Sequence, residues 1–176
     1  MRKYWIILCG LLASAAIVFA ADATAVKAVG PAIAHSAAAV DPDPEAERQL
    51  FIMANEDRAK IGLPPLQMDE GLTLAARQHA TALASQRQLS HQFAGEAPLN
   101  LRLTSYTDLH LDRGGENVAS AATVDQVHES LMLSPALREN LLSETYNVAG
   151  FGVVRRGHTL FVTQDFARAE SRSSHH

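Results

Sequence analysis

The apolar positions divide this chain into a helical first part and a strand-rich last part. Apolar residues at helical spacing predict five helices, at residues 45–61, 69–88, 100–106, from about 123, and 136–142. Asp69 is a suitable N-cap for the second of these helices, and Gly62 follows the end of the first. Pro135 separates the last two helices because proline cannot continue a helix from its preceding turn.

The period changes towards the C-terminus. Residues 147–155 and 158–166 are rich in Val, Phe and Thr, and they predict two strands joined by a two-residue turn at Arg156-Gly157. An earlier strand is predicted at residues 114–120. Helices that precede strands indicate an α+β domain, with the helices packed on a small antiparallel sheet.

The first 20 residues have the pattern of a signal peptide. Arg2 and Lys3 precede a long apolar run, and Ala20 ends a small-residue cleavage site. The alternative is a retained membrane anchor, since the run approaches the length that spans a bilayer. The single cysteine, Cys9, lies inside this segment, so a protein cleaved after Ala20 would contain no cysteine. We therefore expect a secreted, periplasmic or cell-envelope protein that folds without disulfides.

Residues 21–44 are rich in alanine and proline and predict a linker, and residues 169–176 predict a disordered tail. Residues 45–168 remain as one folded domain within the 176-residue chain. The net charge of −4 argues against a nucleic-acid partner. A membrane contact is expected only through an uncleaved N-terminal segment.

The motif Gly114-Gly115-Glu116-Asn117 contains the first candidate for a functional residue. Two glycines permit a tight turn that presents the Glu116 carboxylate at a strand edge. His91 precedes it in Leu89-Ser90-His91. An imidazole and a carboxylate that meet can act as a general base pair or contribute to a metal site, but spacing alone does not establish that these two residues meet.

Several motifs in a fixed order carry a family resemblance. They are Asn55-x-x-Arg58, Gly62-Leu63-Pro64-Pro65-Leu66, Leu74-x-x-x-x-His79-Ala80, Leu89-Ser90-His91, Leu101-Arg102, Gly115-Glu116-Asn117-Val118-Ala119, Ser134-Pro135-x-x-Arg138-Glu139-Asn140 and Val148-Ala149-Gly150-Phe151-Gly152-Val153. Together they resemble the CAP superfamily of cysteine-rich secretory, antigen 5 and pathogenesis-related proteins, in its short bacterial SCP-like branch. The resemblance covers nearly all of residues 45–168. It implies an α-β-α sandwich.

The resemblance also implies a surface cleft lined by paired His and Glu residues, in which the two histidines can hold zinc. His91 corresponds to the first cleft histidine and Glu116 to the cleft glutamate. The position of the second histidine is Leu137 here, and the usual tryptophan nearby is Leu131. Zinc sites need at least three protein ligands, and Leu137 supplies none. We therefore expect no metal and no other cofactor.

The other histidines are weaker candidates. His79 lies on the apolar stripe of its helix and is expected to be a hydrogen-bonded core residue. His128 could replace the missing ligand only by approaching from a neighbouring helix, and His110 is uncommitted. His175 and His176 stand at the chain end, where a frayed pair is the simpler interpretation.

Three functions remain open. The first is a non-enzymatic binding module with a degenerate cleft formed by His91, Glu116, Asn117, Leu137 and Gln164, whose ligand is a small molecule, lipid, peptide or cell-wall component. The second is a hydrolase that uses His91 and Glu116; no serine-nucleophile elbow, metalloprotease motif or phosphate-binding glycine loop accompanies them. The third is lipid or sterol binding, which would require an apolar groove. Leu137 favours the first.

Overall fold

The computed structural model describes residues 39–170. The predicted signal peptide with its cleavage site, most of the predicted linker and residues 171–176 lie outside this range. The elements in chain order are β1 (Val40–Pro42), α1 (Pro44–Lys60), β2 (Gln67–Met68), α2 (Glu70–Gln86), α3 (Leu99–Thr104), β3 (Leu111–Ala121), α4 (Val124–Leu133), α5 (Pro135–Leu141), β4 (Val148–Arg156) and β5 (Thr159–Ala169).

The helices begin where side chains satisfy the free backbone N–H groups of their first turn. Asp43 accepts a hydrogen bond from the amide of Ala46, Asp69 from that of Leu72, and Thr123 from that of Gln126. These caps fix the starts of α1, α2 and α4. Helices α3 and α5 have no such side-chain cap, yet all five helices begin within one residue of their predicted starts, and the four predicted ends lie within two residues.

The sheet has the strand order β1-β4-β5-β3, and β2 adds a short parallel pairing to β4. The β4–β5 turn consists of Gly157 and His158, one residue later than predicted, because Arg156 pairs with Thr159. Gly157 takes the positive φ of 61° that a tight hairpin turn favours at its first position. Residues 40–42, predicted as linker, instead form β1 and pair with the end of β4.

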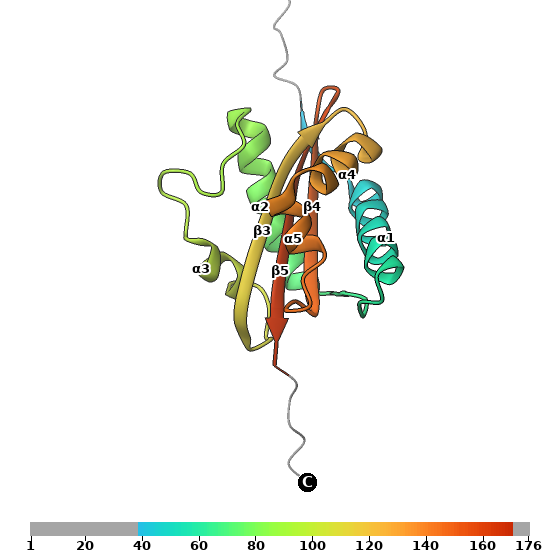
Figure 1. Cartoon of the computed structure of the whole chain (residues 1–176). Coiled ribbons are helices and arrows are strands. Elements are labelled where there is room, and N and C mark those ends of the chain that lie inside the picture. Colours follow the sequence, from blue (N-terminus) through green and yellow to red (C-terminus); the bar gives the residue numbers. More distant parts are fainter. Residues whose placement is uncertain (1–38, 171–176) are drawn as a thin grey trace, which may run out of the picture. The chain divides into compact units, whose positions relative to one another are not determined.

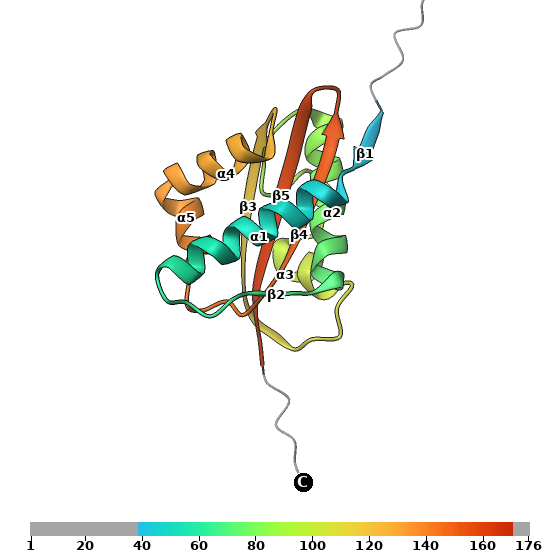
Figure 2. The ribbon, with the colours of Figure 1, turned by 90° about the vertical axis from the view of Figure 1, so that its right-hand side faces the viewer.

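Helices cover both faces of this mainly antiparallel sheet, so the predicted α-β-α sandwich is confirmed (Figure 1). Helix α2 packs on β4 and β5, with α3 beside it on β3. The backbone of α2 comes so close to Gly150 and Gly152 that a side chain at either position would collide with it. Helices α1, α4 and α5 lie over the other face (Figure 2). The core between these helices and the sheet includes Phe151 and Phe166. Within residues 39–170 no helix is long and apolar enough to cross a membrane.

Candidate functional site

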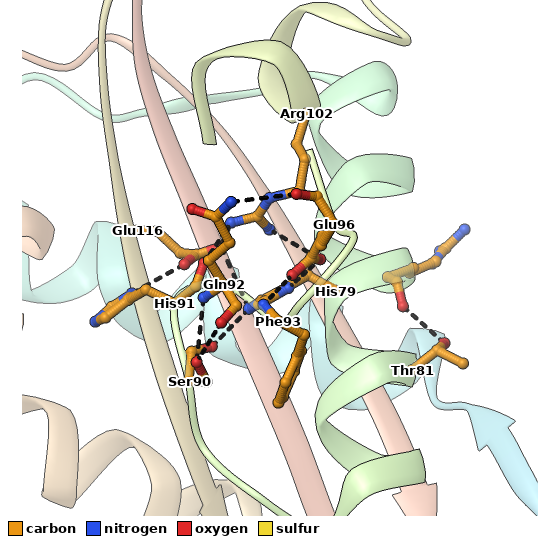
Figure 3. Close-up of polar contacts among 10 residues, drawn as sticks. His79, Thr81, Ser90, His91, Gln92, Phe93, Glu96, Arg102 and Glu116 are labelled. Carbon is orange, nitrogen blue, oxygen red and sulfur yellow. Dashed lines mark hydrogen bonds and ion pairs between the residues drawn. The ribbon is translucent and has the colours of Figure 1, made fainter. Parts of the chain in front are cut away.

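His91 and Glu116 meet at the edge strand β3. Glu116 points from β3 to the sheet face that α2 covers, and His91 reaches it from the loop between α2 and α3 (Figure 3). The Nδ1 atom of His91 lies 2.9 Å from Oε1 of Glu116. The His91 side chain is 63% exposed, whereas that of Glu116 is 1% exposed. A buried carboxylate therefore holds one ring nitrogen and leaves the imidazole facing solvent.

Arg102 of α3 binds the other side of this pair. Its Nη2 atom lies 2.8 Å from Oε2 of Glu116 and also donates a hydrogen bond of 2.9 Å to the carbonyl of His91. The guanidinium is almost fully buried. One arginine thus neutralises the glutamate and holds the backbone of the histidine, so α3 fixes the position of both residues.

A second His–Glu pair lies behind the first. His79 of α2 is fully buried, as predicted, with Nδ1 2.6 Å from Oε1 of Glu96 and Nε2 2.8 Å from the carbonyl of Ser90. Burial raises the pKa of Glu96. Hydrogen bonds from the Phe93 amide and from His79, together with the positive charge of Arg102, outweigh this effect, so the pKa of Glu96 is lowered. Glu96 is therefore ionised, and the loop from Ser90 to Glu96 is tied to α2.

A third carboxyl group completes the cluster. Asp165 of β5 lies directly opposite Glu116 of β3 and is fully buried. Burial, and then the negative charge of Glu116, raise the pKa of Asp165 well above its ordinary value. The cluster thus contains three carboxyl groups beside one guanidinium and two imidazoles.

The other residues of the predicted cleft lie elsewhere. Because successive strand residues face opposite sides, Asn117 and Gln164 point away from Glu116, to the face covered by α1, α4 and α5. The Asn117 amide donates to the carbonyl of Leu137 at 2.9 Å and to Oε1 of Gln164 at 3.1 Å, and the Leu137 side chain packs on the apolar core of that face. The structure therefore brings His91 and Glu116 together without Asn117 and Gln164.

The donor set does not fit the zinc site of the family. Glu116 uses Oε1 to bind His91, and Leu137 has no ligand atom. His128, the possible substitute, pairs with Asp57 of α1 at 2.8 Å, and His110 lies 3.7 Å from Glu170. Among residues 39–170, no three His, Cys, Asp or Glu side chains are arranged to hold a metal ion.

Two grooves border β3 near this cluster, and both include Arg113 and Gly114. The first, between α3 and β3, has a volume of about 440 Å³ and mixes the leucines of α3 with Asn100, Thr104 and Asp112. The second, of about 330 Å³, is lined mainly by polar residues, among them Asn140, Ser143 and Tyr146. Gly114 stands two residues before Glu116, but His91, Glu116 and Arg102 line neither groove, and the second groove lies on the sheet face of Asn117, which binds Asn140.

Sequence reasoning missed Glu96, Arg102 and Asp165 as parts of the site. Arg102 enters the sequence-based prediction only within a family motif. Asp165 does carry a usable signal, because a carboxylate in the middle of a predicted strand rich in Val, Phe and Thr is exceptional unless its charge is compensated. Glu96 lies in an irregular segment whose course could not be predicted.

Comparison with known proteins agrees with this architecture. Residues 51–166 match the cysteine-rich secretory protein family (CAP). The Bacillus subtilis protein YkwD is 30% identical over 112 residues, which are 63% of this chain and 43% of YkwD. The chain therefore spans less than half of that relative.

Solved structures show the same fold. An outer surface protein from Borrelia burgdorferi aligns with a TM-score of 0.68 and 21% identity, over 76% of this chain and 99% of that one. An extracellular Bacillus anthracis protein containing an SCP domain aligns with a TM-score of 0.65 and 26% identity, over 72% of this chain and 41% of that one. The match over most of the folded domain, on an α-β-α sandwich, shows that this chain belongs to the CAP family.

Proposed function

We propose that this chain is a secreted, non-enzymatic binding module whose ligand contacts the exposed imidazole of His91. The observation that carries the proposal is the contrast between His91 and the groups behind it. Glu116, Arg102 and His79 are buried and bind one another, whereas most of the His91 side chain faces solvent. The cluster thus offers a ligand one oriented ring, which can donate or accept a hydrogen bond at Nε2.

A carboxylate that orients a histidine is also found in hydrolases, where the ring activates a nucleophile. The nearest hydroxyl in sequence, that of Ser90, is already committed. Its Oγ donates to the carbonyl of Gln92 at 2.7 Å and accepts from the Gln92 amide at 3.2 Å. These bonds hold the turn at Ser90, and they favour a binding function over a hydrolase in which Ser90 is the nucleophile.

The two grooves indicate the kind of ligand. A volume of about 440 Å³ is within the usual range for small-molecule sites. Its leucines alternate with an amide, a hydroxyl and the charged side chains of Asp112 and Arg113, and the second groove is mainly polar. This mixture favours a polar, extended ligand such as a cell-wall strand over a hydrocarbon chain, and no zinc or other cofactor is required for it.

Secretion fits the relatives, which include proteins described as outer surface and extracellular. It also fits the positively charged and then apolar N-terminus, which is typical of a signal peptide. N-terminal sequencing of the exported protein should begin at or near Ala21. An intact N-terminus in the membrane fraction would instead support a retained anchor.

The binding proposal is tested by co-sedimentation with isolated peptidoglycan sacculi and, separately, with anionic lipid vesicles. We expect saturable binding to sacculi that His91→Ala weakens at least tenfold. His158→Ala is the matched control, because His158 is an exposed histidine in the β4–β5 turn. Binding to vesicles but not to sacculi would support the lipid function instead.

The enzymatic alternative is tested with panels of peptide and ester substrates. We expect no turnover above that of the buffer. Hydrolysis that disappears in both His91→Ala and Glu116→Ala, while each variant keeps its circular dichroism spectrum, would overturn the binding proposal.

A further inference from the structure

We propose that Asp165 is a positioning residue: its carboxyl group is protonated and donates a hydrogen bond to Glu116, which keeps Glu116 directed at His91. Asp165 does not touch solvent or a ligand and acts only through Glu116. This inference concerns how the exposed imidazole is held, and it stands independently of what that imidazole binds.

The two carboxyl groups are forced together by the sheet. Asp165 and Glu116 are direct cross-strand partners, so their side chains project side by side from the face that α2 covers. On its other side Asp165 is opposite Gly150, over which the backbone of α2 passes at contact distance. Asp165 therefore cannot turn towards water.

Hydrogen-bond accounting requires a donor between the two groups. Neither carboxyl oxygen of Asp165 receives a hydrogen bond from the described residues, and Oε2 of Glu116 has the ion pair with Arg102 and a longer contact of 3.8 Å with Nε2 of His79. Two ionised carboxylates in this position would repel each other while buried. A proton on Asp165 supplies the missing donor to Oε2 of Glu116 and removes the repulsion.

The charges of the neighbouring elements lead to the same assignment. The titratable and charged groups that surround the pair are His79 of α2, Arg102 of α3, and Glu96 and His91 of the intervening loop. Nδ1 of His79 is bound to Glu96 and Nε2 to the carbonyl of Ser90, so the ring is not a donor to Asp165. With Asp165 neutral, the guanidinium of Arg102 lies beside two negative carboxylates, those of Glu96 and Glu116, and not three.

The assignment gives Asp165 a definite effect on the site. Oε2 of Glu116 is held by Arg102 and the Asp165 hydroxyl, which leaves Oε1 for His91. Asparagine keeps a donor at this position through its amide, whereas valine is of similar size and has none. Asp165→Asn should therefore preserve the His91–Glu116 contact and Asp165→Val should lose it.

Infrared spectroscopy tests the protonation directly, on protein whose aspartates carry carbon-13 in the side-chain carboxyl. At pH 7 we expect an isotope-shifted C=O band of a protonated acid in the wild type. The band should be absent in Asp165→Asn and unchanged in Asp108→Asn, which alters an exposed aspartate. Absence of the band from the wild type, or its persistence in Asp165→Asn, would overturn the proposal.

Nuclear magnetic resonance of the imidazole tests the positioning role. We expect the hydrogen-bonded Nδ1 proton of His91 to be seen in the wild type and in Asp165→Asn, and to be lost in Asp165→Val. Loss of the signal in Asp165→Asn would show that a donor at this position does not keep Glu116 directed at His91, and it would overturn the positioning role. If Asp165→Val does not fold, the infrared comparison of wild type with Asp165→Asn still decides the protonation.

Discussion

Replacement of Arg58 by methionine should destabilise the domain strongly, although Arg58 lies far from the candidate site in sequence. The Arg58 side chain extends from the last turn of α1 and is fully buried. It donates hydrogen bonds to four neutral backbone carbonyls, those of Pro64, Leu141, Ser143 and Tyr146, at 2.9–3.3 Å. One guanidinium thus joins α1, the following loop, the end of α5 and the segment leading to β4.

The magnitude follows from these four bonds. Hydrogen bonds to charged groups contribute about 1.5–3 kcal/mol each, so the four bonds give a gross loss of at least about 6 kcal/mol. Two effects reduce it. Burial lowers the pKa of Arg58, which reflects the cost of keeping this cation out of water, and methionine does not incur that cost. Three of the four bonds are only partly buried, so water can replace the donor there. We expect a net loss of about 3 kcal/mol in the free energy of unfolding.

The assay is urea and thermal unfolding followed by circular dichroism. For a domain of this size the expected loss corresponds to a decrease of about 10 °C in Tm. Arg58→Lys should lose about half as much, since an ammonium group cannot match the planar fork of the guanidinium. Arg48→Met is the control on the same helix: Arg48 is exposed and bonds only to Glu45, so the change should be within about 0.5 kcal/mol. An Arg58→Met protein as stable as the Arg48→Met protein would refute this reasoning.

Three further predictions concern the sheet and its two faces. Gly150→Ala should destabilise the domain by roughly 3 kcal/mol in urea unfolding, because the new methyl group would collide with the backbone of Leu72 and Thr73. Asn117→Ala should lower the free energy of unfolding by about 2 kcal/mol, because it breaks the hydrogen bonds to Leu137 and Gln164. It should leave ligand binding at His91 unchanged, because Asn117 is on the other face of the sheet. Weaker binding by a folded Asn117→Ala protein would show that Asn117 contributes to the site. The pKa of Asp165 is raised in the folded protein. The stability that Asp165 contributes to the wild type is therefore fully present below its unfolded pKa of about 3.9, and it is lost as the pH rises towards the folded pKa. Between these two pKa values, the free energy of unfolding of Asp165→Asn should rise relative to that of the wild type by about 1.4 kcal/mol per pH unit. If the difference between the two proteins does not change with pH in this range, the pKa of Asp165 is not raised.

The fold could be predicted largely because its signals are local. Helix limits follow from apolar spacing and from caps such as Asp43 and Asp69, which act within three residues of themselves. The strand β1 could not be predicted, since three residues that end in proline form a strand only because β4 offers them a partner. The predicted hairpin turn lies one residue too early because Gly157 is the first residue of the turn and not its second.

The site was less predictable because it depends on contacts between distant segments. Spacing could not establish that His91 meets Glu116; the family resemblance brought them into one prediction, and the structure places them 2.9 Å apart. The hypothesis of a degenerate cleft also included Asn117 and Gln164, yet strand alternation places those amides on the opposite face. Alternation could have been applied to the sequence, because Asn117 directly follows Glu116.

The arrangement around His91 has a consequence for specificity. The charged groups beneath the imidazole bind one another, so they can set the orientation of the ring but cannot contact a ligand while they remain buried. We therefore expect the choice of ligand to depend on the groove between α3 and β3, which combines leucines with polar and charged side chains. Exchange of Leu99, Asn100, Leu101, Leu103 and Thr104 for the residues of a relative, with Arg102 kept, should consequently change which ligand binds, while His91→Ala should weaken binding to every one of them.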